Sequence, residues 1–294
     1  MPGWAGDPQP LAGPGVVTRP RPAIRSARPD DLGRLGPVYE QAGFGGRLAK
    51  VVGFARARLE GEVVVAEADA EVVGVAAGAV FGGTGWVGGV AVVPAHRRIG
   101  LGGALTEAIV EFLEGRGLAT VLLHATALGR PVYERLGFVP ETPYRTLSGP
   151  ALPRGPRDGP VRAGQAADLE AVLTLDLAAT GEDRRRLLTA LWPTGGLVAA
   201  TGGRLLGYHL ASPWRTGGAT IAAEPADGLA LLDAVRAAAG DEVAISVPTA
   251  NTAAVEFLEA AGFAEVYRTI RMYRGPRVPW DPAALFGAHN LFWG

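Results

Sequence analysis

The 294-residue sequence contains no cysteine, a single lysine and four histidines. Without cysteine the chain cannot form disulfide bonds, a catalytic thiolate or a cysteine-ligated zinc site. The histidines, at positions 96, 124, 209 and 289, are too scattered to show metal-ligand spacing. The formal net charge of −1 gives no support to nucleic acid or another polyanion as a partner. We therefore expect neither a metal cofactor nor a nucleic-acid partner.

Long apolar runs are also missing. No stretch reaches the length of a membrane span, and the N-terminus lacks the charged-then-apolar pattern of a secretory signal. We therefore expect a cytoplasmic protein without a membrane partner. Residues 1–22 are rich in proline and glycine and show no periodicity, which predicts a disordered tail. The rest of the chain is long enough for two domains, each with a hydrophobic core.

A strand, a glycine-rich loop and a helix are predicted in succession over residues 86–114. The apolar, β-branched run Val87–Val93 indicates a buried strand, which Pro94 ends because it cannot donate to a ladder. Apolar residues recur at helical spacing from Leu101 onward. Between them lies Arg97–Gly103, with the sequence RRIGLGG. Glycines allow close backbone approach, and a helix N-terminus and arginines attract anions, so we predict a phosphate site here.

Two common phosphate loops do not match this stretch. A Walker loop needs Gly-Lys-Ser/Thr before the helix, and this loop contains no lysine. A dinucleotide-binding loop needs G-x-G-x-x-G, but counting from Gly100 places Leu105 at the last glycine. The sequence therefore disfavours both a P-loop nucleotidase and a dehydrogenase.

The stretch resembles the pyrophosphate loop of the Gcn5-related N-acetyltransferases, the GNAT family. Their pattern is Gln/Arg-x-x-Gly-x-Gly/Ala after a strand that ends in a Val-x-Pro-like turn, and Arg97–Gly102 follows Val92-Val93-Pro94 in the same way. The family typically carries Tyr-x-x-x-Gly-Phe after the next strand, which is predicted here over 119–123, and Tyr133–Phe138 matches that motif. The chain departs from the family at Thr126 and Gly129, where Asn and Ala are usual.

The chain resembles itself at domain scale. A Pro- and Gly-rich stretch over 148–160 predicts a linker, and beyond it Val161–Leu169 echoes Ile24–Leu32. Near the end, Leu258–Phe263 echoes Tyr133–Phe138. Self-similarity of this kind is typical of a duplicated fold. We predict an N-terminal catalytic domain over 23–147, a linker over 148–160 and a C-terminal domain with its tail over 161–294.

The second copy lacks the residues that would hold a cofactor. The counterpart of the phosphate loop carries Glu224 and Asp227, and Leu258 stands where the first copy has Tyr133. Asn251 and Ala254 nevertheless keep the Asn-x-x-Ala spacing that the first copy lost. The resemblance is therefore to tandem GNAT proteins with an active N-terminal and a degenerate C-terminal domain.

This resemblance implies an α/β (α+β) fold: two tandem GNAT domains, each a mixed, mostly antiparallel sheet flanked by helices. It implies acetyl-CoA as the co-substrate and direct transfer of the acetyl group to a primary amine of an acceptor that the sequence does not identify. The alternative is a non-catalytic acyl-CoA-binding sensor or interaction module. A monomer, as a pseudo-dimer of domains, and a homodimer are both compatible with the duplication.

Motif positions in the family imply roles for single residues. Tyr133 would protonate the departing thiolate, and the backbone N–H of Val90 would face the thioester oxygen. His124, at the end of the strand after the helix, is a candidate base, although its place at a strand end also has a purely structural explanation. The residues implied to bind the cofactor are Val90, Ala91, Val92, Arg97, Arg98, Ile99, Gly100, Leu101, Gly102, Gly103, Ala104 and Thr126.

Two other segments carry expectations. The run Arg184–Arg186 is interpreted as a solvated helix face and not as an anion site. The last segment, over 275–294, contains two phenylalanines and two tryptophans. Because such side chains are costly to leave in water, we predict that this segment folds back onto a domain.

Overall fold

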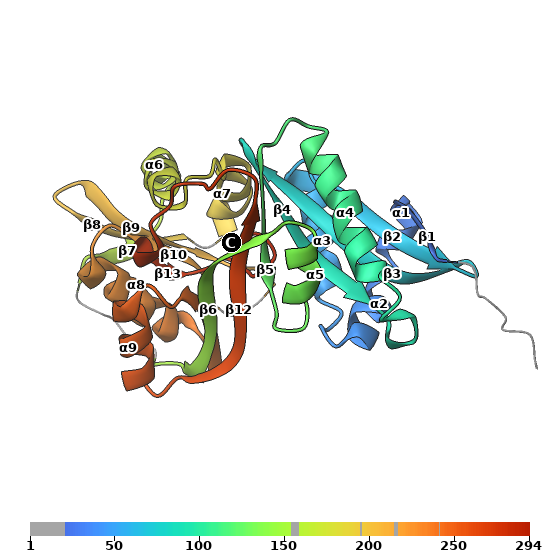
Figure 1. Ribbon diagram of the computed structural model, residues 1–294. Coiled ribbons are helices and arrows are strands. Elements are labelled where there is room, and N and C mark those ends of the chain that lie inside the picture. The colour runs from blue at the N-terminus through green and yellow to red at the C-terminus, as the bar shows by residue number, and fades with distance from the viewer. Residues whose placement is uncertain (1–20, 154–158, 195, 215–216, 241) are drawn as a thin grey trace, which may run out of the picture.

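The computed structural model describes residues 21–153, 159–194, 196–214, 217–240 and 242–294, in two halves that lie side by side (Figure 1). Most of the predicted N-terminal tail lies outside these ranges. None of the helices in them combines the length and hydropathy that a membrane span needs. The elements of the first half are β1 (Ala23–Ser26), α1 (Pro29–Leu32), α2 (Leu35–Ala42), α3 (Leu48–Arg58), β2 (Val63–Ala68), β3 (Glu71–Phe81), β4 (Thr84–Val92), α4 (Leu101–Glu114), β5 (Thr120–Ala125), α5 (Arg130–Arg135) and β6 (Val139–Pro150).

The second half repeats this order of elements in outline. A strand and helices are followed by a meander, a helix that crosses to the next strand, a shorter helix and a last long strand. Its elements are β7 (Val161–Ala163), α6 (Leu169–Thr180), α7 (Arg185–Leu191), β8 (Gly196–Thr201), β9 (Arg204–Ala211), β10 (Gly218–Ala222), α8 (Pro225–Ala238), β11 (Glu242–Pro248), α9 (Thr252–Ala260), β12 (Ala264–Arg274) and β13 (Leu285–Gly287).

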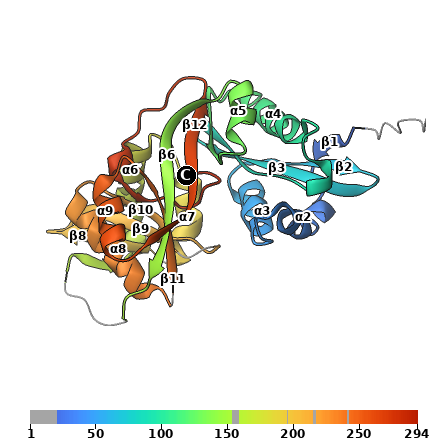
Figure 2. The same ribbon diagram turned by 60° about the horizontal axis from the view of Figure 1, so that its bottom comes forward.

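The strands form two sheets. Among the described residues the larger sheet has the order β1-β2-β3-β4-β5-β12-β6-β11, and the smaller has the order β13-β10-β9-β8-β7. Helices α4 and α5 cover one face of the first half's sheet, and α2 and α3 cover the other (Figure 2). The apolar face of α4, including Leu105, Ile109 and Leu113, is fully buried in this core, as its periodicity predicted. The predicted mixed, mostly antiparallel sheet is confirmed for the larger sheet, in which β4–β5 is the parallel pair, whereas the described strand pairs of the smaller sheet are all antiparallel.

The two halves exchange their last long strands. Strand β12 of the second half inserts between β5 and β6, antiparallel to both, so that Arg271 lies opposite His124 on one side and Thr142 on the other. Strand β6 of the first half pairs in turn with β11, from Tyr144 to Pro150. The first three residues of the predicted linker therefore belong to a strand. As a consequence, the larger sheet is built from strands of both halves.

A buried carboxylate joins the two halves beside this exchange. One side-chain oxygen of Glu182 accepts hydrogen bonds from Thr84 Oγ1 at 2.8 Å and Trp86 Nε1 at 2.7 Å, both in β4. Burial raises the pKa of Glu182, while Arg271 and Arg184 act in the opposite direction. Two donors on one buried oxygen fix the second half against β4, the central strand of the first.

The interpretation of Arg184–Arg186 as a solvated face is wrong for its first residue. Arg184 is buried, and its Nε donates to Asp176 at 3.0 Å. Only Arg185 and Arg186 are exposed, and each pairs with a glutamate at the surface. A buried guanidinium is stable only with such a partner, so the ion pair of Arg184 belongs to the core between the halves.

The prediction that the last segment folds back onto a domain is confirmed, because Phe286 and Trp293 are buried.

The strand exchange predicts that the two copies cannot be separated by cutting the linker. Residues 1–156 and 157–294, produced as separate polypeptides in one cell, are expected to copurify as a 1:1 complex. Each alone should aggregate because it would present unpaired strand edges. The N-terminal polypeptide would lack β12 between β5 and β6, and the C-terminal polypeptide would lack both neighbours of β12. Size-exclusion chromatography with a tag on one polypeptide measures this, with the intact chain as the control. Recovery of a folded, monodisperse N-terminal polypeptide without its partner would contradict the prediction.

Candidate active site

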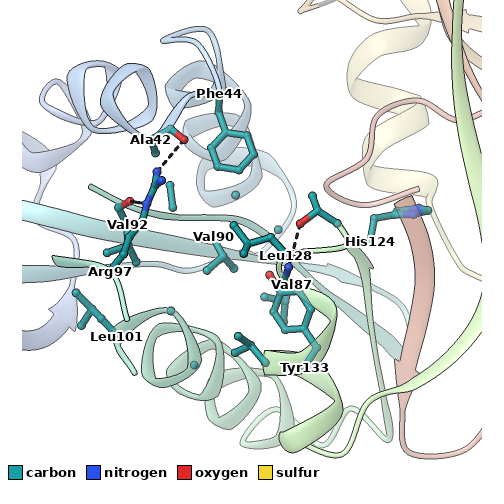
Figure 3. Close-up of a pocket in the computed structure, with 18 of the residues that line it drawn as sticks. Ala42, Phe44, Val87, Val90, Val92, Arg97, Leu101, His124, Leu128 and Tyr133 are labelled. Atoms are coloured by element: carbon teal, nitrogen blue, oxygen red, sulfur yellow. Dashed lines mark hydrogen bonds between the residues drawn. The ribbon is translucent and has the colours of Figure 1, made fainter. Parts of the chain in front are cut away.

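A cavity of about 1080 Å³ opens between β4 and β5. The two strands pair in parallel only at their starts in the described structure, with Thr84–Val87 opposite Thr120–Leu123, and then diverge. Figure 3 shows the cavity between the loop after β4 and the helix α5. The first half supplies most of its walls.

A β-bulge shapes the wall on β4. The register between β3 and β4 shifts beside Gly89, whose φ is +63°. The hydroxyl of Tyr39 donates to the Gly89 carbonyl at 2.9 Å, and a Cβ on Gly89 would lie 2.6 Å from that hydroxyl. Only glycine satisfies both the conformation and the close contact. The bulge brings the next residue, Val90, into the cavity wall. The resemblance to the GNAT family implies that the backbone N–H of Val90 is a hydrogen-bond donor there.

The predicted phosphate loop lies at one end of the cavity. Arg98 and Gly100 are in the left-handed region, with φ of +64° and +82°, and Gly100 caps the N-terminus of α4. The side chain of Arg97 braces the loop: its Nε donates to Val92 O at 2.9 Å and its Nη2 to Ala42 O at 3.0 Å (Figure 3). A Cβ on Gly102 would meet only Val92 Cγ2, at 4.0 Å, so the backbone there faces open space. This cradle at a helix N-terminus suits a phosphate group.

Most of the predicted cofactor residues meet in this cavity, but two do not line it. Ile99 is 47% exposed outside it, and Ala104 belongs to the next turn of α4. Thr126 lines the cavity, but its Oγ1 accepts a hydrogen bond from Gly129 N at 3.0 Å and so shapes the turn before α5. The predicted residues that line the cavity are Val90, Ala91, Val92, Arg97, Arg98, Gly100, Leu101, Gly102, Gly103, His124, Thr126 and Tyr133.

Tyr133 lies inside the cavity, on α5. Its ring points into the cavity (Figure 3), and it packs edge-on against Phe138 with 6.1 Å between ring centroids. Burial raises the pKa of Tyr133 to about 12, and the neighbouring Tyr267 adds to the shift. The hydroxyl therefore keeps its proton at neutral pH, which is the state that a proton donor needs.

His124 lies in an aromatic environment. Its ring stacks on Trp86 at 5.4 Å and meets the edge of Tyr144 at 4.5 Å between centroids. Its Nδ1 is 3.5 Å from Thr269 Oγ1, whereas Nε2 has no hydrogen-bond partner among the described residues. Burial, and then the positive charge of Arg271, lower the pKa of His124 to about 3. The imidazole is thus neutral and weakly basic at physiological pH.

The second half supplies a part of the cavity that the sequence motifs do not predict. Tyr267 and Thr269 reach it from β12, and Leu291 and Phe292 reach it from the last segment. No local motif marks these four residues, because only the strand exchange brings them there. Phe44 completes this side from the connection between α2 and α3. Among the described lining residues there is no aspartate or glutamate, while Arg97, Arg98 and Arg135 contribute positive charge.

In the second half, a segment of the polypeptide fills the gap that corresponds to the cavity between β4 and β5. Strand β10 precedes α8 and β11 follows it, as β4 and β5 flank α4. Between them lies β13, which pairs antiparallel with β10 and places Gly287 opposite Thr220. Phe286 packs so closely on α8 that a Cβ on Gly228 would lie 2.4 Å from its ring. A segment of the protein's own backbone therefore occupies this gap.

Family models match both halves of the chain. A GNAT acetyltransferase domain matches residues 59–140, and a second GNAT acetyltransferase domain matches residues 172–287. Together these regions contain the strands that flank both gaps. No curated protein sequence matches the chain.

Solved structures share the arrangement of the whole chain. A protein from Pyrococcus horikoshii, described as a candidate acetyltransferase, is 21% identical with a TM-score of 0.80, and the match covers 96% of this chain and 99% of that one. A GCN5-related N-acetyltransferase from Sphaerobacter thermophilus is 19% identical with a TM-score of 0.62, over 88% and 97% of the two chains. These likenesses show a common fold. With a GNAT domain matched in each half, the chain is a tandem GNAT protein and belongs to the GNAT N-acetyltransferases.

Proposed function

We propose that the chain transfers an acetyl group from acetyl-CoA to a primary amine by direct attack, in the cavity of its first half. GNAT acetyltransferases use acetyl-CoA, which supplies the acetyl group as a reactive thioester. The observation that carries the proposal is the position of Tyr133. Its protonated hydroxyl shares one cavity with the glycine-rich loop Arg97–Gly103.

Backbone groups of the first half bind the cofactor in this proposal. The cradle from Arg98 to Gly103 holds the pyrophosphate, with Arg97 bracing the loop from behind. The bulged edge of β4, from Val90 to Val92, holds the pantetheine arm where β4 and β5 diverge. The N–H of Val90 stabilises the oxygen of the carbonyl under attack.

The reaction balances with one proton donor on the protein. The amine nitrogen forms a bond to the carbonyl carbon, the carbon–sulfur bond breaks, and the amine releases a proton to water. Tyr133 gives its hydroxyl proton to the departing thiolate and regains one from solvent. No step requires His124 to accept a proton, in keeping with its low pKa.

The walls favour an acceptor with an apolar body. Phe44, Leu48 and Phe292 present hydrocarbon surface, and no carboxylate among the described lining residues could hold an ammonium group. An amine must be neutral to attack, and an acid-free site avoids stabilising the protonated form. We therefore propose a monoamine with an apolar or aromatic body, not a polyamine.

A non-catalytic acyl-CoA sensor is the second candidate. Two observations favour it: no carboxylate is among the described residues that line the cavity, and burial lowers the pKa of His124. Thiol release from acetyl-CoA, followed with 2-phenylethylamine and with spermidine, separates the two. Sustained release with the apolar amine supports the enzyme. Tight CoA binding without release across the amine panel would favour the sensor.

The cradle predicts one CoA site per chain and its loss in Gly102→Asp. The carboxylate would lie where the phosphates bind, so the affinity for CoA should fall by about two orders of magnitude. The fold should be retained, because the side chain has room and an acidic residue suits the first turn of a helix. Titration calorimetry measures the affinity for CoA, and thermal melting measures the stability of the fold. Gly102→Asn is the control for size without charge, and two equivalent sites per chain would refute the prediction.

Tyr133→Phe should bind CoA with unchanged affinity and lose roughly 10²–10⁴-fold in kcat, because only the hydroxyl group that donates the proton is removed. The loss should appear in kcat, since the hydroxyl acts as the thiolate forms. Tyr273→Phe removes a hydroxyl from β12 outside the cavity lining and is the matched control, expected to behave like the parent chain. Equal kcat for the two variants would eliminate Tyr133 as the acid.

The pH dependence of kcat/KM should follow the amine and not a histidine. With its pKa lowered to about 3, His124 is already neutral above pH 5 and does not titrate in the working range. Activity should rise with pH to an inflection at the acceptor's own pKa, and the inflection should move when 2-phenylethylamine is replaced by the weaker base phenylalaninamide. His124→Gln should leave the inflection in place. An inflection near pH 6.5 that both amines share, and that His124→Gln removes, would identify His124 as the base.

A further inference from the structure

The gap in the second half and the cavity in the first are connected by one stretch of chain. Residues 282–288 fill the gap between β10 and β11, and the chain then runs directly to Leu291 and Phe292 in the cavity wall. Both ends of this stretch, which we call the bridging segment (residues 282–293), are held by identifiable contacts. In Figure 1, β13 lies inside the second half, beside β10 and α8, and the C-terminus lies near the boundary between the halves.

Asn251 holds the first end. It is buried at the N-terminus of α9, and its Nδ2 donates to Ala283 O at 2.8 Å and to Leu285 O at 3.0 Å. Its Oδ1 accepts from Ala254 N at 2.9 Å, so the amide uses both hydrogens and its oxygen. On the other side of the gap, Ala288 N donates to the carbonyl of Ser246 in β11 at 2.7 Å. The segment is thus tied to both strands that border the gap.

The second end is fixed against the β4 bulge. Asn290 Oδ1 accepts from the backbone N–H groups of Phe292 at 2.7 Å and Trp293 at 3.1 Å, which makes a tight turn. Trp293 is buried, and the backbone of Phe292 lies so close to β4 that a Cβ on Gly88 would be 2.6 Å from its carbonyl oxygen. This turn sets where the ring of Phe292 meets the cavity.

We propose that the filled gap of the second half anchors the acceptor wall of the first, with Asn251 as the positioning residue. This inference rests on the proposed function, since it assigns a role to the same cavity. The side chain of Asn251 makes its hydrogen bonds to Ala254 and to the bridging segment, and it acts on Phe292 through that segment. The second copy thus contributes to acceptor selection without binding a cofactor.

The test uses Asn251→Ser in the full chain. Serine keeps an oxygen that can accept from Ala254 N, but it removes both donors to the bridging segment. Hydrogen exchange of the amides in residues 285–293 should become about tenfold faster. The KM for 2-phenylethylamine should rise about five- to tenfold, because the wall is no longer held in place, while kcat and the affinity for CoA stay within about twofold. Asn251→Gln restores the donors on a longer arm and should recover part of the lost exchange protection.

A double-mutant cycle separates this role from a loss of stability. Phe292→Ala alone should raise the amine KM to a similar extent, and adding Asn251→Ser to it should change KM by no more than about twofold. Asp168→Asn is the control for destabilisation of the second half. It removes the negative charge that pairs with Arg162 and one of the two acceptor oxygens, at the N-terminal end of α6, and should leave KM unchanged. Additive effects of Asn251→Ser and Phe292→Ala on KM would overturn the inference, as would unchanged exchange over 288–293.

The two levels of the proposal fail in different ways. Exchange and CoA affinity are measured without turnover, so they report on the anchor even if no amine is acetylated. Absence of acetyl transfer to any amine with normal CoA binding refutes the enzyme, and the exchange data then decide whether Asn251 positions Phe292. Turnover with a loosened segment and an unchanged KM would overturn the inference alone.

Discussion

The insertion of β12 between β5 and β6 is the constraint on which the rest of the structure depends. It makes one continuous sheet from strands of both halves, and the polar contacts between the halves gather around it. Arg271 in β12 is buried, pairs with Glu141 and stacks over Trp280 at 4.2 Å. Such a buried ion pair is stable only when both partners remain in place. The exchange also carries Tyr267 and Thr269 into the cavity of the first half.

The duplicated fold uses the same architectural gap in two ways. In the first half the diverging strands β4 and β5 leave a cavity, lined by a loop with glycines where a phosphate can approach. In the second half β13 fills the gap, and Glu224 and Asp227 lie at the N-terminus of α8, the end that would face a phosphate. A polypeptide backbone offers the same donors and acceptors to strand edges as a pantetheine arm does, so it satisfies β10 without a ligand.

Burial sets the acid–base properties of the site. It raises the pKa of Tyr133 to about 12 and lowers that of His124 to about 3, so both side chains are neutral in the same range of pH. A neutral phenol is a proton donor, but a histidine that resists protonation is a weak base. In the proposed reaction Tyr133 therefore protonates the leaving group, and the proton of the amine passes to water. Acceptors with low pKa values gain most from such a site.

The sequence by itself determined the local chemistry. The position of Arg97–Gly103 between an apolar strand and an amphipathic helix predicted the cradle, and the motif Tyr133–Phe138 predicted the tyrosine inside the cavity. The similarity of the start and the end of the first half to those of the second predicted the duplication. These features depend on residues close together in the chain, whose spacing fixes strand, turn and helix. Only the tertiary structure decided the exchange of β6 and β12, the braced side chain of Arg97, the burial of Arg184 and the entry of Phe292 into the cavity. Each of these results from contacts between segments far apart in the sequence, where backbone pairing and burial, not local pattern, set the position of a side chain.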